Sequence, residues 1–438
     1  MYDYLVLSVP TIVRTNNNNK RKRLPDHVVI GYADNFDSKD KILQAVKDGV
    51  NVIVWAFFNF DENTGKINQP RASKAVSLIE HEIPKDVIHL TSFGGWNGPH
   101  LLSRTPEKDY YSAQQLYDAW VEFNQNHQEA FDGFDWDLEG NDNPQAKTAV
   151  FTYDCLQKVV EMSRLAKCDE YIVGMAPPQS YLDIQSDFST ISPYFNNNHN
   201  NNEQQHVKNN KNVAPFSTRL NFPPTLISPL WHPEFHYTSH NSYAYLLAHH
   251  SEAFDFISIQ FYETWSRANY EINQHDKNSI DPSDYLVRYV KDLLFRQEGY
   301  HVSFPNEILL PTTKNAHHMH VNVQLQDMEN IEKNGKLGDE TTVFISLPMH
   351  KLVFGFANGW ALDRKDGGAI FFQPSDIQKA FDVLRQDADI VKNKHSLPRG
   401  CMFWCIDHEG DHGIYMAKEL NKIWNHLKDE KTKITQSS

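Results

Sequence analysis

The stretch FDGFDWDLEG, residues 131–140, alternates acidic side chains with large apolar ones. Successive side chains of a β-strand point to opposite faces, so Asp135, Asp137 and Glu139 share one face and the apolar residues between them share the other. A strand with an apolar face belongs in a core, where burying an ionised group costs several kcal/mol per ion. The three acids therefore predict an enclosed polar site rather than a solvated surface.

Seven further runs have the near-continuous apolar character of parallel strands that are covered on both faces. Helix-like stretches lie between several of them, for example 38–49, 112–127 and 147–167. Eight alternating β and α units predict a closed (β/α)8 TIM barrel. With the acidic stretch, the predicted strands lie in residues 28–35, 50–60, 87–97, 131–140, 171–179, 254–263, 351–359 and 399–410.

The domain prediction is one catalytic barrel over residues 27–428, with a disordered N-terminal tail at 1–26 and a C-terminal tail at 429–438. Long inserts follow strands five and six, and no insert domain separates strands seven and eight. The first insert contains an Asn-rich low-complexity segment, which we expect to be disordered. The two inserts centre on residues 195–213 and 264–345.

Composition excludes several classes of partner. The net charge of -14 argues against nucleic acid and anionic membranes, and we expect a monomer. The four cysteines do not form a disulfide framework. Cys401 and Cys405 lie in one strand, with Cα atoms about 13 Å apart, which exceeds disulfide reach. The histidines of KNAHHMH, residues 314–320, lack metal-ligand spacing, so we predict no metal and no cofactor.

The acidic face should hold protons at neutral pH, because neighbouring carboxylates cannot all ionise cheaply. Glu139 ends this series of acids at the carboxyl end of the fourth strand, where TIM-barrel active sites lie. A protonated glutamate there has the property that acid-catalysed cleavage of a glycosidic bond requires. A metal-binding acidic cluster is the alternative, although acids spread along one strand coordinate a single ion poorly.

The motif DGFDWDLE resembles the D-G-x-D-x-D-x-E signature of glycoside hydrolase family 18, the chitinases and their relatives. Three other strand ends resemble the family in order. They are SFGG at 92–95, QFYE at 260–263 and GCMFWCID at 400–407. The resemblance covers the barrel from about residue 27 to 425 and leaves the inserts and tails outside it.

The resemblance implies substrate-assisted hydrolysis, in which the 2-acetamido oxygen of the sugar replaces a protein nucleophile. Glu139 would be the acid and then the base, and Asp137 would orient the acetamido group. Asp135 would share a proton with Asp137, Tyr262 would hydrogen-bond the acetamido carbonyl, and Trp404 would stack under a sugar ring.

The remaining predicted substrate-binding residues lie at strand ends, namely Tyr32, Phe58, Gly95, Trp96, Gln179, Gln260 and Glu263. Asp132 lies three positions before Asp135 and so has the opposite strand parity; we expect it to fix the strand or a nearby loop. The family often has cis peptides beside barrel aromatics, which implies them at Ala56–Phe57 and Trp404–Cys405.

The leading hypothesis is a retaining, endo-acting chitinase whose partner is chitin or another N-acetylglucosamine oligosaccharide. The alternatives are an endo-β-N-acetylglucosaminidase acting on N-glycan cores and a chitin-binding lectin-like barrel. Two features depart from the family pattern. Glu263 replaces the usual Asp or Asn after the tyrosine, and a short connection between strands seven and eight implies an open cleft. Family members are often secreted, but the sequence has neither a clear signal peptide nor a glycosylation sequon, so the location is undetermined.

Overall fold

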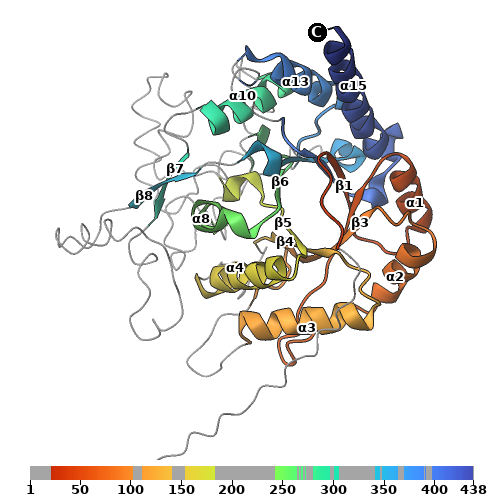
Figure 1. Ribbon diagram of the computed structural model, residues 1–438, viewed down its shortest axis with the longest axis vertical. Helices are drawn as coiled ribbons and strands as arrows, with labels where there is room; N and C mark the ends of the chain where they lie inside the picture. Colours follow the sequence, from red (N-terminus) through yellow and green to blue (C-terminus); the bar gives the residue numbers. More distant parts are fainter. Residues whose placement is uncertain are drawn as a thin grey trace, which may run out of the picture.

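The computed structural model contains a closed barrel of eight parallel strands surrounded by helices, as the strand pattern predicts (Figure 1). The strands follow the circular order β1-β10-β9-β6-β5-β4-β3-β2. The structure describes residues 21–101, 111–140, 153–182, 242–263, 266, 268–269, 272, 280–295, 300–304, 341–345, 348–363, 369–388, 390 and 397–437.

Each of the eight predicted runs contains one barrel strand. The strands are β1 (Val28–Ala33), β2 (Val52–Trp55), β3 (Ile88–Gly95), β4 (Gly133–Leu138), β5 (Ile172–Met175), β6 (Phe256–Gln260), β9 (Leu352–Ala357) and β10 (Gly400–Trp404). Every residue of these strands is buried except Trp404, which is partly exposed at the carboxyl end of β10. The near-continuous apolar character of the runs reflects this burial on both faces.

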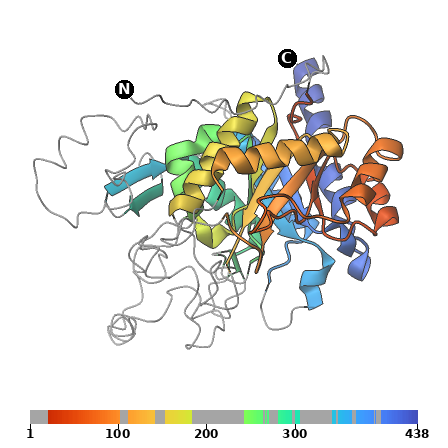
Figure 2. The ribbon, with the colours of Figure 1, turned by 90° about the horizontal axis from the view of Figure 1, so that it is seen from below.

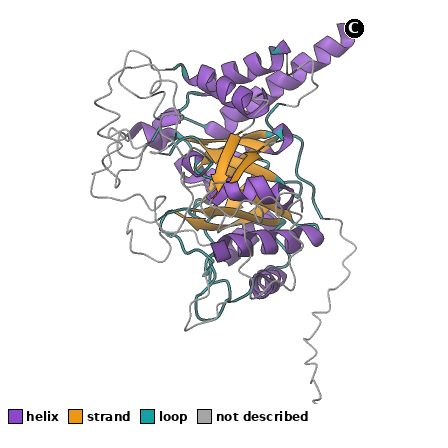
Figure 3. Cartoon of the chain, turned by 90° about the vertical axis from the view of Figure 1, so that its left-hand side faces the viewer, coloured by secondary structure: helices purple, strands orange, loops and turns teal. Residues whose placement is uncertain are grey.

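The helices lie around the strands, so that the sheet is enclosed on its outer face (Figures 1 and 3). They are α1 (Lys39–Lys47), α2 (Ala72–His81), α3 (Ala113–Asn126), α4 (Tyr153–Cys168), α8 (Ser242–His250), α10 (Pro282–Phe295), α13 (Pro374–Gln386) and α15 (Met416–Ser437). Ser112 caps α3 through a capping box with Gln115, which satisfies free backbone N–H groups at its start. Ser38 precedes α1 but makes no such side-chain bond.

Strand alternation sends the apolar residues of β4 outward, against the helices. Trp136 donates its indole N–H to the Ser163 hydroxyl of α4 at 2.9 Å. Phe134 packs edge-on against Trp120 of α3, with ring centroids 5.1 Å apart. All three rings are completely buried. The acidic residues of the same strand must therefore face the barrel interior.

An antiparallel pair of strands lies outside the ring of barrel helices, β7 (Tyr300–Phe304) with β8 (Thr341–Ile345) (Figures 1 and 2). Together with α10, this pair falls inside the predicted insert after strand six. The Asn-rich segment 195–213 and the histidine-containing stretch 314–320 lie outside the described residues.

The predicted tails need correction where the structure describes them. Arg21 stacks over the Tyr171 ring at 3.4 Å and donates to the Asp169 carbonyl, so the last residues of the predicted N-terminal tail contact the barrel. At the other end, α15 runs to Ser437, through almost all of the predicted C-terminal tail. Both segments look polar in sequence because they lie on the barrel surface.

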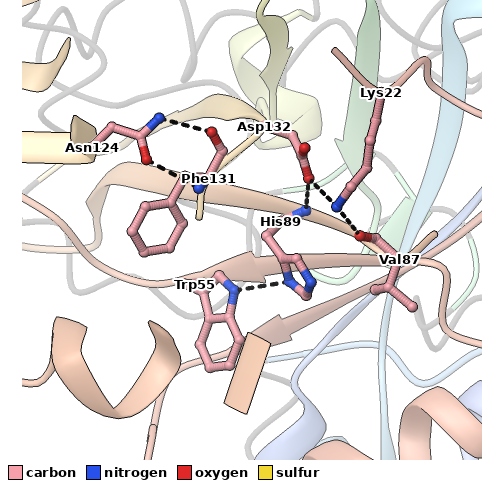
Figure 4. A network of polar contacts seen from close by, with 7 residues as sticks. All are labelled: Lys22, Trp55, Val87, His89, Asn124, Phe131 and Asp132. Atoms are coloured by element: carbon pink, nitrogen blue, oxygen red, sulfur yellow. Dashed lines mark hydrogen bonds and ion pairs between the residues drawn. The ribbon is translucent and has the colours of Figure 1, made fainter. Parts of the chain in front are cut away.

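Asp132 belongs to a polar network at the amino end of β4 (Figure 4). One of its carboxylate oxygens accepts from the His89 backbone N–H at 2.8 Å and from the Lys22 ammonium at 3.0 Å. Lys22 also donates to the Val87 carbonyl at 2.7 Å. The carboxylate thus fixes β4 to β3 and to the N-terminal segment, which is the structural role that its strand parity indicates.

All four cysteines are free, as predicted, and Cys168 is the exposed one. Burial raises the pKa of the Cys401 thiol far above its ordinary value. A buried thiol of this kind is protonated and unreactive.

Candidate active site

Three acids follow one another along the inner face of β4 and its end. Their exposed fractions rise from 0% for Asp135 to 3% for Asp137 and 7% for Glu139. Glu139 thus lies nearest to solvent, at the carboxyl end of the strands. In the part of the chain that the structure describes, no lysine or arginine forms a salt bridge with any of the three.

Asp135, the deepest acid, is held by two hydroxyl groups. Tyr32 of β1 donates to one carboxylate oxygen at 2.6 Å, and Ser92 of β3 donates to the same oxygen at 3.1 Å. Burial raises the pKa of Asp135 to about 6, although both hydrogen bonds oppose the rise. The structure therefore brings the predicted Tyr32 to the acids and adds Ser92, which the SFGG motif contains.

Asp137 and Glu139 form a coupled pair bridged by Gln260 of β6. The Gln260 amide nitrogen lies 2.7 Å from an Asp137 oxygen and 3.3 Å from a Glu139 oxygen, and it also donates to the Ala176 carbonyl at 2.6 Å. Gln260 is itself 1% exposed, so this amide is shielded from water.

The pKa values of this pair are raised mainly because both groups are buried. The pKa of Asp137 lies well above its ordinary value, and the neighbouring charges of Glu139 and Asp135 add to the rise. The pKa of Glu139 rises to about 7, while hydrogen bonds from Asp137 and Gln260 oppose the increase. Asp137 therefore keeps its proton at neutral pH and donates it to Glu139.

Aromatic rings lie beside the acids at the end of β10. Trp404 is partly exposed; its ring stacks on Phe57 at 5.7 Å and lies 5.5 Å from Tyr32. The peptides Ala56–Phe57 and Trp404–Cys405 are both cis, as the resemblance implies. Gly95 has φ +82°, and a Cβ there would lie 2.5 Å from the Phe57 ring, so only glycine leaves room for that ring.

Tyr262 and Glu263 follow β6 at the same end of the barrel. Tyr262 is buried, and its ring meets Trp360 edge-on at 6.3 Å. Burial and then the charge of Glu263 are the main causes that raise the pKa of the Tyr262 hydroxyl. The same Glu263 charge contributes to the raised pKa of Asp137, which places Glu263 within electrostatic reach of the acids.

Phe58 is a wrong prediction. It is completely buried, and its ring packs edge-on against Phe123 and Phe131, on the helical side of the sheet. Its neighbour Phe57 faces the site instead. β2 ends at Trp55, so strand alternation no longer determines which of the two phenylalanines points inward.

Gln179 has a structural environment rather than an open one. Its amide nitrogen donates to the Tyr285 hydroxyl of α10 at 2.5 Å, and its amide oxygen accepts from the Ala268 backbone at 3.0 Å. The side chain is completely buried, which corrects the prediction that it contacts substrate. Trp96, directly after β3, is partly exposed, as a residue at the rim of the site should be.

Within the described residues, no group of three or more metal-ligating side chains could hold an ion. Across the same residues, no helix has the length and apolar character needed to span a membrane. The arrangement offers a proton donor, a partner carboxyl and an aromatic surface.

The family model described as "Glycosyl hydrolases family 18" matches residues 28–409, which is most of the chain. The chain belongs to glycosyl hydrolase family 18. It is therefore a glycoside hydrolase by family, and the matched region contains all the acids, glutamines and aromatics described above. Among curated proteins, no sequence matches this chain.

Solved structures of family 18 chitinases share the fold at low sequence identity. A chitinase from Chromobacterium violaceum is 16% identical with a TM-score of 0.50, and the match covers 92% of this chain and 84% of that one. The C-terminal domain of Legionella pneumophila ChiA is 15% identical with a TM-score of 0.46, covering 90% and 97%. Chitinase ChiB from Flavobacterium johnsoniae is 15% identical with a TM-score of 0.42, covering 93% and 96%.

Proposed function

We propose that this family 18 protein is a chitinase that hydrolyses β-1,4 links between N-acetylglucosamine units. The observation that carries the proposal is Glu139, a carboxyl group at the barrel rim whose pKa is raised to about 7. Such a group holds a transferable proton near neutral pH, as protonation of a glycosidic oxygen requires.

In the proposed first step, Glu139 gives its proton to the glycosidic oxygen as the bond from that oxygen to the anomeric carbon breaks. The acetamido carbonyl oxygen of the same sugar attacks the anomeric carbon and forms a cyclic oxazolinium ion. Asp137 orients the acetamido N–H and stabilises the positive charge. The Tyr262 hydroxyl donates to the acetamido carbonyl and aligns it for attack.

In the second step, ionised Glu139 takes a proton from water, and the oxygen of that water attacks the anomeric carbon and opens the ring. Two inversions at this carbon give net retention of configuration. Glu139 regains the proton that it donated, so the protein is unchanged. Throughout, Asp135 keeps its hydrogen bonds from Tyr32 and Ser92 and limits the charge on Asp137.

Sugar binding is assigned to the aromatic side of the site, with the Trp404 ring as the platform under one sugar. The partial exposure of Trp404 and its stacking on Phe57 support this role, because the ring is both accessible and fixed. Gln260, Gly95, Trp96 and Glu263 belong to the proposed substrate-binding set.

Endo action is also part of the proposal. In the described residues between β9 and β10, the chain forms the short helix η5 (Gly359–Asp363) and α13, as a plain barrel connection would. Without an added wall on this side, a long polymer could lie across the rim. The absence of an insert domain here therefore supports an open cleft.

The test compares the purified protein on colloidal chitin, chito-oligosaccharides and a high-mannose glycopeptide. We expect release of oligosaccharides from chitin and internal cleavage of chitotetraose and longer chains. Release from the glycopeptide alone would contradict the proposal in favour of an endo-β-N-acetylglucosaminidase. Binding without turnover would instead indicate a lectin-like barrel.

A further inference from the structure

We propose that Tyr243 is a positioning residue for Glu139, acting through the backbone of β4; the inference rests on the proposed function. Tyr243 lies on α8, more than one hundred positions after the acid in sequence. Its hydroxyl accepts a hydrogen bond from the Leu138 N–H at 2.7 Å and lies 3.0 Å from the Leu138 carbonyl. Leu138 directly precedes Glu139, so the hydroxyl holds the peptide from which the acid projects.

The hydroxyl is needed because the neighbouring strand ends too early to hold this part of β4. Pairing between β4 and β5 ends where the Ala176 N–H donates to the Trp136 carbonyl at 2.8 Å. Pro177 and Pro178 follow, and proline has no N–H to continue a ladder. The Ala176 carbonyl, which could accept from the next residue of β4, instead accepts from Gln260.

A buried peptide left without hydrogen-bond partners is costly, so some other group must satisfy Leu138. Tyr243 does this with a single oxygen, which accepts from the Leu138 N–H and has two carbonyls as acceptors for its proton. The second is the Trp136 carbonyl at 3.2 Å. The side chain thus extends the strand pairing by one step, just before the catalytic acid.

The Tyr243 ring is itself fixed. It is 1% exposed and stacks on Tyr181, with ring centroids 6.1 Å apart and planes inclined by 19°. On the following residue, His100 places its Nε2 2.6 Å from the Glu139 carbonyl. A carbonyl can only accept, so this nitrogen carries the proton. The backbone on both sides of the Glu139 Cα is therefore held by side chains from outside the strand.

The first variant is Tyr243→Phe, which keeps the stacked ring and removes only the hydroxyl. We expect kcat/KM for chitotetraose to fall about tenfold, because a small displacement of an acid weakens proton transfer strongly. The matched control is Tyr117→Phe on α3. Tyr117 is equally buried and loses a hydroxyl that donates to Asp169 at 2.7 Å, and we expect activity within about twofold of wild type.

A second substrate separates positioning of the acid from general damage. The 2,4-dinitrophenyl glycoside of chitobiose has a leaving group that departs without protonation. We therefore expect Tyr243→Phe to lose less than about threefold in kcat/KM on this substrate. The ratio of the two kcat/KM values, measured on one preparation, is independent of the fraction of folded enzyme.

The outcomes are distinguishable. Inactive wild-type protein would contradict the proposed function itself. Active wild type with an unchanged ratio in Tyr243→Phe would overturn the positioning role alone. If Tyr243→Phe yields no folded protein, Tyr181→Leu removes the stacking partner. It should then shift the ratio in the same direction, and an unshifted ratio there would equally overturn the inference.

Discussion

The two ends of β4 treat a buried carboxyl group in opposite ways. At the amino end, Asp132 forms a salt bridge with Lys22 at 3.0 Å and accepts a backbone N–H (Figure 4). At the carboxyl end, Asp137 and Glu139 face each other and a glutamine, and the described residues supply them with no salt bridge. Burial raises the pKa of the carboxyl groups at both ends, but only at the amino end does a cation oppose it.

The difference shows how one strand separates stability from chemistry. A carboxylate paired with a cation stays ionised and holds its neighbours in place. A carboxyl group that is buried among other acids keeps a proton at neutral pH and can transfer it. The barrel thus places its structural acid at one end and its reactive acids at the other.

The largest effect should come from Glu139→Gln, which preserves shape but removes the transferable proton. We expect kcat/KM for chitotetraose to fall about a thousandfold or more, while binding measured by calorimetry persists. Glu122→Gln, at an exposed site on α3, is the matched control and should retain full activity. Near wild-type hydrolysis by Glu139→Gln would remove the proposed division between the two ends.

Asp137→Asn should have the next largest effect, about a hundredfold loss in kcat/KM, because the acetamido group loses its partner. The same change removes the proton that Asp137 donates to Glu139. An oxazoline-type analogue of the cyclic intermediate should inhibit the wild type more strongly than this variant. Equal inhibition of both would argue against any contact between Asp137 and the intermediate.

The reactive end should also cost stability as the pH rises. The pKa of Glu139 is raised to about 7 in the folded state, so the folded protein holds this proton more tightly than the unfolded chain. Its contribution is favourable below the unfolded value, near pH 4.5, and is lost as the pH rises through 7. Glu139→Gln should therefore be more stable than wild type at pH 8, by at most about 3 kcal/mol. Denaturant unfolding at pH 8 and at pH 4.5 measures the gap, which should narrow at the lower pH.

The smallest effect should be at the structural end. Asp132→Asn keeps an oxygen for the His89 N–H but loses the charge that pairs with Lys22. We expect a loss of about 1 kcal/mol in unfolding free energy, with kcat/KM unchanged. A double-mutant cycle with Lys22→Met measures the coupling of the pair. A large loss of activity in Asp132→Asn would mean that the two ends are not separate.

The sequence predicts the barrel well because alternation in β4 and eight buried runs are local patterns. The same alternation predicts which acids share the inner face. It gives no guidance beyond the strand ends, which is why Phe58 was chosen in place of Phe57. Tyr243 and His100 could not be predicted, since they hold Glu139 through backbone contacts that depend on where β5 ends and how α8 packs.

The pH dependence of kcat/KM for the wild-type protein on chitotetraose tests the central claim most directly. Glu139 must be protonated to act as the acid, so the account predicts a fall in kcat/KM with an apparent pKa near 7. The same fall should appear in Lys22→Met, where only the structural end is changed. Activity that stays constant from about pH 6 to pH 9, or that falls near the ordinary glutamate pKa of about 4.3, would contradict the account.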